Sequence, residues 1–140
     1  MTPTFFTDRD LGKQFPAILK DAGLHVERHL DHFAPDATDE SWLEVVGRRG
    51  WLAVTHDGRI RYKPNELAAV MRHQVALFVV IGQATHAELA HAFVKTLPSV
   101  VRFSEQHSPP YIAKVHRPSP SEIAKNPEAR GTVTLWHPVA

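Results

Sequence analysis

The apolar run at residues 75–82 constrains the fold most, because it reads Val-Ala-Leu-Phe-Val-Val-Ile before its closing glycine. A run of this kind is typical of a strand covered on both faces, as in a parallel sheet flanked by helices. Shorter apolar runs at residues 5–6 and 51–55 also resemble buried strands. Apolar residues at helical spacing fill residues 11–22 and 39–46. Strands and helices therefore alternate along the chain.

This alternation predicts an α/β fold with three layers, α/β/α, around a mainly parallel sheet of four to five strands. A polar strand at residues 25–30 and a helix at residues 64–73 complete the order. We expect the first four strands to lie in the order 2-1-3-4. A long helix is predicted from Thr85 to Phe103, with Pro98 kinking or dividing it.

The C-terminal part differs in pattern from the rest. Residues 111–116 alternate weakly and predict an edge strand, which pairs with residues 131–136 as a β-hairpin. We expect residues 1–116 to form one domain, on which residues 117–140 pack as a C-terminal extension.

Composition excludes several classes of protein. The net charge of +1 argues against a strongly basic nucleic-acid-binding protein, although it leaves room for a local basic patch. The absence of cysteine excludes disulfides, thiol catalysis and thiolate metal sites. No secretory signal is recognisable, and the longest apolar run is too short to span a bilayer, so we expect a cytoplasmic protein.

Three acidic residues stand where a parallel sheet would gather them. Asp8 and Asp57 follow strands, and Asp39 opens a helix behind the N-cap candidate Thr38. In open α/β sheets, ligands bind beyond the carboxyl ends of the strands. Carboxylates that meet there suit Mg²⁺ or Mn²⁺, and we expect the Thr55 hydroxyl to fix the Asp57 carboxylate.

Each acid also has a structural explanation. Asp39 is favoured in a first helical turn, Asp57 with Gly58 makes a turn, and Asp8 could cap a helix. The metal site therefore depends on all three meeting at one edge.

A basic stripe follows directly after Asp57. Arg59, Arg61 and Lys63, with Tyr62 between them, suit contacts to an RNA phosphate backbone. A solvated loop face is the alternative. The ten histidines show no metal-ligand spacing, so most are expected on the surface.

Several of these segments together resemble the PIN-like nuclease domains, most closely the VapC-type toxin branch, over residues 4–116. The resemblance is carried by the run Phe5-Phe6-Thr7-Asp8-Arg9-Asp10-Leu11-Gly12, by Asp31-His32-Phe33 with Asp36, by Asp39-Glu40-x-Trp42-Leu43, by Gly50-Trp51, and by Thr55-x-Asp57-x-x-Ile60-Arg61-Tyr62.

The resemblance implies an endoribonuclease dependent on Mg²⁺ or Mn²⁺, acting as the toxin of a toxin–antitoxin pair. It implies that Asp8, Asp39 and Asp57 are the catalytic metal ligands. The family commonly carries a further Glu, for which no clear match exists; the remaining candidate acids are Asp31, Asp36, Glu40 and Asp10. The implied partners are RNA and a cognate antitoxin protein, and a homodimer through the helix at residues 85–103 is a further expectation.

Other functions stay open at the sequence level. Asp8-x-Asp10 also resembles the opening of haloacid-dehalogenase-type phosphatases, although no acid follows the strand at residues 75–82. A receiver-type signalling domain would use Thr85 and Lys114 together with the strand-end acids. A PIN-like domain that only binds a partner is the third alternative.

Overall fold

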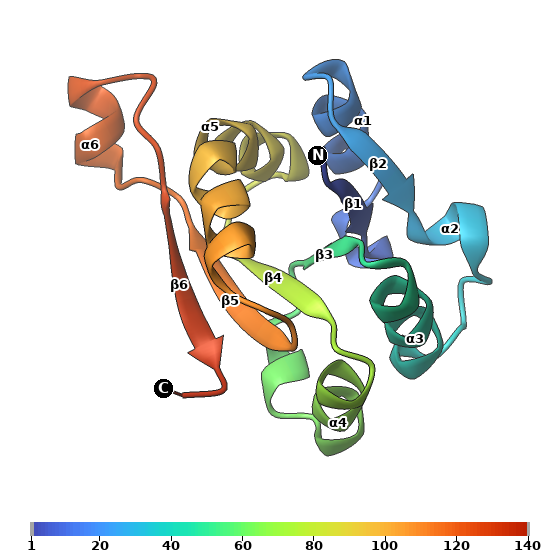
Figure 1. Ribbon diagram of the computed structural model, residues 1–140. Helices are drawn as coiled ribbons and strands as arrows, with labels where there is room; N and C mark the ends of the chain where they lie inside the picture. Colours follow the sequence, from blue (N-terminus) through green and yellow to red (C-terminus); the bar gives the residue numbers. More distant parts are fainter. Residues whose placement is uncertain (1, 140) are drawn as a thin grey trace.

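The computed structural model describes residues 2–139, which form a six-stranded sheet in the order β2-β1-β3-β4-β5-β6 (Figure 1). The first five strands all run parallel to their neighbours among them, and β6 runs antiparallel to β5. The strands are β1 (Thr4–Thr7), β2 (His25–Arg28), β3 (Leu52–Thr55), β4 (Ala76–Ile81), β5 (Tyr111–His116) and β6 (Thr132–His137).

The helices cover both faces of this sheet. They are η1 (Arg9–Leu11), α1 (Gln14–Asp21), α2 (His29–His32), α3 (Asp39–Arg49), η2 (Gly58–Arg61), α4 (Pro64–Arg72), α5 (His86–Gln106) and α6 (Pro120–Lys125), of which η1 and η2 are short 3₁₀ helices. None of the helices within residues 2–139 is both long enough and apolar enough to cross a membrane.

Strand alternation divides the buried side chains into two cores. On one face, Phe5 and Phe78 pack against α1 and α5 through Phe15 and Phe93. On the other face, Phe6 and Leu77 pack against α3 and α4, and Phe6 stacks on Trp42 with ring centroids 5.3 Å apart. A sheet with both faces covered needs apolar residues at every position of its central strand, which explains the run in β4.

The predicted fold class is confirmed: the sheet is mainly parallel, its first four strands lie in the order 2-1-3-4, and a C-terminal hairpin pairs β5 with β6. The sheet has six strands rather than four or five. The expectation that residues 111–116 form an edge strand was wrong, because β6 occupies the edge beyond β5.

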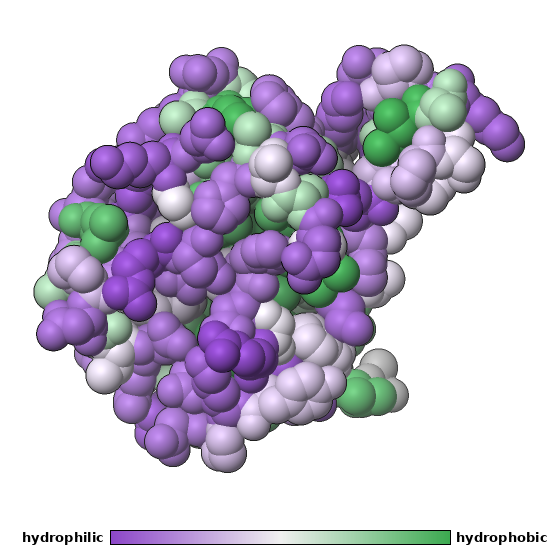
Figure 2. Space-filling view, turned by 180° about the vertical axis from the view of Figure 1, so that it is seen from behind, coloured by the Kyte–Doolittle hydropathy of each residue, from purple (hydrophilic) through white to green (hydrophobic). Residues whose placement is uncertain are grey.

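Pro98 was expected to kink or divide the long helix, and it does not divide it, because α5 continues through Pro98. One other helix prediction was wrong. The first long helix begins at Gln14 instead of Leu11, because Gly12 takes a φ of 67° and separates η1 from α1. The polar stretch after β5 contains α6, which projects from the body as a separate lobe (Figure 2).

Candidate active site

The carboxyl ends of β1 and β3 lie side by side and bring the strand-end acids to one edge of the sheet. The two strands are parallel neighbours, and the Asp8 backbone N–H donates to the Val54 carbonyl at 2.9 Å. Asp8 directly follows β1, and Asp57 stands two residues beyond the end of β3. Asp39 is the first residue of α3, behind Thr38 as its N-cap.

Thr55, the last residue of β3, links two of these acids. Its buried hydroxyl donates to Asp8 Oδ2 at 2.9 Å and accepts from the Asp57 backbone N–H at 3.1 Å. We expected this hydroxyl to fix the Asp57 carboxylate, which was wrong: it fixes Asp8. The reason is register, because the end of β3 lies directly beside the residue that follows β1.

Asp8 lies close to a second carboxylate. Burial raises its pKa, the hydrogen bond from Thr55 lowers it, and the negative charge of Asp39 raises it further; the net shift is upward. The Asp39 carboxylate is itself held by the Trp42 indole N–H, which donates to Oδ1 at 3.0 Å. The α3 acid is therefore oriented by its own helix and lies within electrostatic reach of Asp8.

Asp10 joins this group through η1. The residue is exposed as a whole, yet protein atoms crowd its carboxyl group, which accepts from the His56 backbone N–H at 3.2 Å. Desolvation and the charge of Asp8 raise the pKa of Asp10 to about 6. From the sequence, Asp10 was only one of several further candidate acids for the metal site. Its spacing is the signal that could have favoured it over the others, since a residue two positions after Asp8 can return to the same strand end.

Asp57 has a different environment. Its carboxylate caps η2 by accepting from the Arg59 backbone N–H at 3.0 Å. The Arg59 side chain pairs with it at 2.9 Å and Lys63 Nζ lies 3.4 Å from it. Burial raises the pKa of Asp57, but the hydrogen bonds from Arg59 and the charge of Lys63 outweigh it, so the net pKa is lowered.

The remaining candidate acids are dispersed. Glu40 pairs with Arg72 of α4 at 2.8 Å. Asp31 pairs with Arg28 at 2.7 Å, and Asp36 is exposed in the connection between α2 and α3. Of the predicted phosphate-binding residues, Arg59 and Lys63 face Asp57, whereas the guanidinium of Arg61 lies 5.5 Å from the ring centroid of Tyr62.

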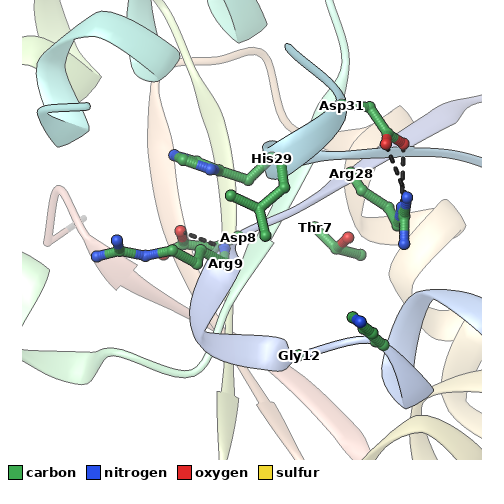
Figure 3. Close-up of a pocket in the computed structure, with 9 residues that line it drawn as sticks. Thr7, Asp8, Arg9, Gly12, Arg28, His29 and Asp31 are labelled. Atoms are coloured by element: carbon green, nitrogen blue, oxygen red, sulfur yellow. Dashed lines mark hydrogen bonds and ion pairs between the residues drawn. The ribbon is translucent and has the colours of Figure 1, made fainter. Parts of the chain in front are cut away.

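A pocket of about 300 Å³ opens beside Asp8, at the ends of β1 and β2 (Figure 3). Asp8 and Arg9 lie at one side of it and the Arg28–Asp31 ion pair at the other. His29 also lines the pocket, although we expected most histidines at the surface; only 3% of it is exposed. Burial lowers the pKa of His29.

Carboxylate side chains are suitable ligands for a hard cation, but the arrangement of these carboxylates is less suitable. Carboxylates whose pKa values are raised by burial and mutual repulsion, such as Asp8 and Asp10, are stabilised when a cation neutralises them. Within residues 2–139, however, no three His, Asp or Glu side chains are arranged to hold a metal ion together. The Asp57 carboxylate in particular already pairs with Arg59 and Lys63.

One of the alternatives, the receiver-type domain, loses both of its key residues. Lys114, which a receiver domain would direct at the acids, has its ammonium 4.3 Å from the ring centroid of Trp136. Thr85 caps α5 by accepting from the Glu88 N–H at 3.1 Å.

Comparison with known proteins bears on the same segment. A sequence model of the PIN-like domain family matches residues 3–82, which include all the acids described above. A protein of Mycobacterium tuberculosis that is named as a candidate ribonuclease, VapC45, is 29% identical over 126 residues, covering 86% of this chain and 88% of that protein. No solved structure matches the chain.

Proposed function

Because this chain belongs to the PIN-like domain family, we propose that it is a metal-dependent endoribonuclease that hydrolyses RNA phosphodiesters as the toxin of a toxin–antitoxin pair. The observation that carries this proposal is the position of Asp8. It lies at the carboxyl edge of the sheet, within electrostatic reach of Asp39 and Asp10, and Thr55 links it to Asp57, which pairs with Arg59 of η2. Acids and cations at one sheet edge suit an anionic substrate that requires a cation.

In this proposal Asp8, Asp39 and Asp57 hold Mg²⁺ or Mn²⁺, with Asp10 as a fourth acid beside them. The bound ion supplies Lewis-acid chemistry: it polarises the phosphate and offsets the negative charge that develops on its oxygens. Thr55 orients the Asp8 carboxylate through its 2.9 Å hydrogen bond.

The pairing of Asp57 with Arg59 and Lys63 has a role in the same proposal. While no RNA is bound, the two cations neutralise Asp57. An RNA phosphate offers them another anion, which frees Asp57 to act as a ligand. Arg59 is well placed for this exchange because 81% of its side chain is exposed.

The test is Asp8→Asn, assayed for cleavage of a fluorescent RNA with Mn²⁺, with Mg²⁺ and with EDTA. Asparagine keeps an acceptor for Thr55 but loses the charge, so the variant should fold normally. The loss of cleavage should exceed the roughly 10- to 100-fold that removal of a residue supporting a metal ligand costs. Asp21→Asn, at the exposed end of α1, is the matched control and should cleave like the wild type.

Cleavage that persists in Asp8→Asn, or that persists in EDTA, contradicts the proposal. The toxin role has a separate test: expression should arrest growth, and co-expression of the small protein encoded beside this gene, the expected antitoxin, should relieve the arrest.

A further inference from the structure

A cluster of aromatic and cationic side chains lies beside the acidic site but outside its chemistry. Tyr62, after η2, meets Trp136 of β6 edge to face, with ring centroids 5.9 Å apart. Each ring carries a cation. The guanidinium carbon of Arg61 is 5.5 Å from the Tyr62 centroid, and Lys114 Nζ is 4.3 Å from the Trp136 centroid. We call these four residues the aromatic platform.

The two rings differ in their exposure to solvent. Trp136 is partly buried against the second core, and its ring edge lies 3.8 Å from the position that a Cβ on Gly58 would take. Tyr62 is 72% exposed, although burying an aromatic ring is strongly favourable. Trp136 therefore supports the platform, and Tyr62 offers an open ring to a ligand.

The cations of the platform are also uncommitted. Among the ion pairs within residues 2–139, neither Arg61 nor Lys114 has a carboxylate partner. Their charge therefore remains available to an anion.

The platform adjoins the acidic site through η2. Gly58, which faces Trp136, directly follows Asp57, the N-cap of η2. Lys63, which directly follows Tyr62, has its Nζ 3.4 Å from the Asp57 carboxylate. Trp136 and Lys114 lie beyond residues 3–82, the range that the family model matches. The C-terminal hairpin brings both residues to this surface beside η2.

We propose that the aromatic platform binds single-stranded RNA, with one base stacked on Tyr62 and neighbouring phosphates held by Arg61 and Lys114. This inference rests on the proposed ribonuclease function for the identity of its ligand. A largely exposed aromatic ring beside cations is an arrangement that binds single-stranded nucleic acids, because their unpaired bases can stack while their phosphates need positive charge. Bases of a duplex are already stacked and cannot reach the ring.

The experiment measures binding of a fluorescent single-stranded RNA by anisotropy in EDTA, where no cleavage is expected. Tyr62→Ala should weaken binding between about 5-fold and about 100-fold, the range for loss of one base–aromatic stack. Tyr62→Phe keeps the ring and should bind like the wild type. Ile123→Ala is the matched control: it truncates another exposed apolar residue, on α6, and should change nothing.

Salt dependence separates stacking from charge. Arg61→Gln should weaken binding and make it less sensitive to salt, whereas Tyr62→Ala should leave the salt dependence unchanged. A blunt-ended duplex RNA of equal length, which has no unpaired bases, should bind the wild type and Tyr62→Ala equally.

Three results overturn the inference. The first is equal RNA binding by Tyr62→Ala and the wild type, and the second is equal affinity of the wild type for single-stranded and duplex RNA. The third is Tyr62-dependent binding of a polyglutamate peptide that is tighter than binding of RNA, which would assign the surface to an acidic protein. Cleavage is measured separately. A wild type that cleaves RNA with Tyr62→Ala unaffected in binding removes the platform and leaves the ribonuclease. Tyr62-dependent binding without any cleavage does the reverse.

Discussion

Neighbouring carboxylates in this site have opposite electrostatic surroundings. Burial and other acids raise the pKa of Asp8 and of Asp10, whereas Arg59 and Lys63 outweigh burial at Asp57 and lower its pKa. The first two acids are destabilised as anions, and the third is stabilised as one. A cation arriving at the site would therefore gain most from Asp8 and Asp10.

This contrast predicts how Asp10 affects stability with pH. Its carboxyl holds a proton up to about pH 6 in the native state, but only up to its ordinary pKa of 3.8 in the unfolded chain. Between these values the native state binds more protons, so stability falls as pH rises. The cost is absent below pH 3.8 and fully present above about pH 6.

Asp10→Asn should therefore stabilise the metal-free protein at pH 7.5 by about 1 kcal/mol, a value reduced for the exposure of the residue. The gain should shrink at pH 4.5. Urea unfolding in EDTA at both pH values measures it, with Asp21→Asn as the control that changes little at either. An equal gain at both pH values would mean that charge is not the cause.

At the scale of elements, α3 positions Asp39 through its N-terminal cap. Thr38 Oγ1 accepts from the Ser41 N–H at 3.3 Å, and its extended backbone directs the chain into the helix. The cap satisfies one of the N–H groups that a helix start leaves without a partner. Asp39, in the first turn, also has a favourable interaction with the helix dipole.

Thr38→Ala should lower the free energy of unfolding by about 1 kcal/mol, the usual cost of losing such a cap. Thr38→Ser keeps the hydroxyl and should cost much less. Urea titration of the three proteins measures both effects. Equal losses in the two variants would show that the threonine methyl group, rather than the hydroxyl, stabilises this helix start.

Elements with strong local signals were predictable from the sequence, whereas their neighbours in space were not. Thr38 and the apolar run of β4 each specify their structure locally. Pro98 did not interrupt α5, because packing of Phe93, Val100 and Phe103 against the sheet outweighs the loss of one hydrogen bond. Tertiary contacts of this kind are absent from local sequence patterns.

The same limit applied to the site. That Asp8 and Asp57 share one sheet edge followed from the topology rule for parallel sheets. That Asp57 faces Arg59 and Lys63, and that Thr55 bonds Asp8, depended on side-chain rotamers and strand register, which no spacing rule supplies. Which of the acids bind a metal stays a prediction.

For the whole molecule, the C-terminal strand extends the α/β core by placing distant residues together. Tyr62 and Trp136 are far apart in sequence and meet only because β6 turns back antiparallel along β5. The turn into β6 depends on Gly131, whose N–H donates to Thr96 Oγ1 of α5 at 2.9 Å. The hairpin is thus fastened to α5 at the end opposite Trp136.

Gly131 is also packed too tightly to carry a side chain. A Cβ at this position would overlap the carbonyl oxygen of His116 and lie 3.0 Å from Thr96 Oγ1. Gly131→Ala should therefore lower the free energy of unfolding by roughly 1–3 kcal/mol, the usual cost of overpacking. Thr134→Ala, at an exposed position of the strand β6 that follows Gly131, is the control and should change the free energy of unfolding little.

The same substitution also tests the position of β6. If β6 shifts as a unit to relieve the overlap, Gly131→Ala should bind RNA more weakly than the wild type, and adding Tyr62→Ala to it should weaken binding no further. Urea unfolding and anisotropy on the single and double variants measure both effects, and unchanged stability in Gly131→Ala would show that the hairpin does not need this close contact.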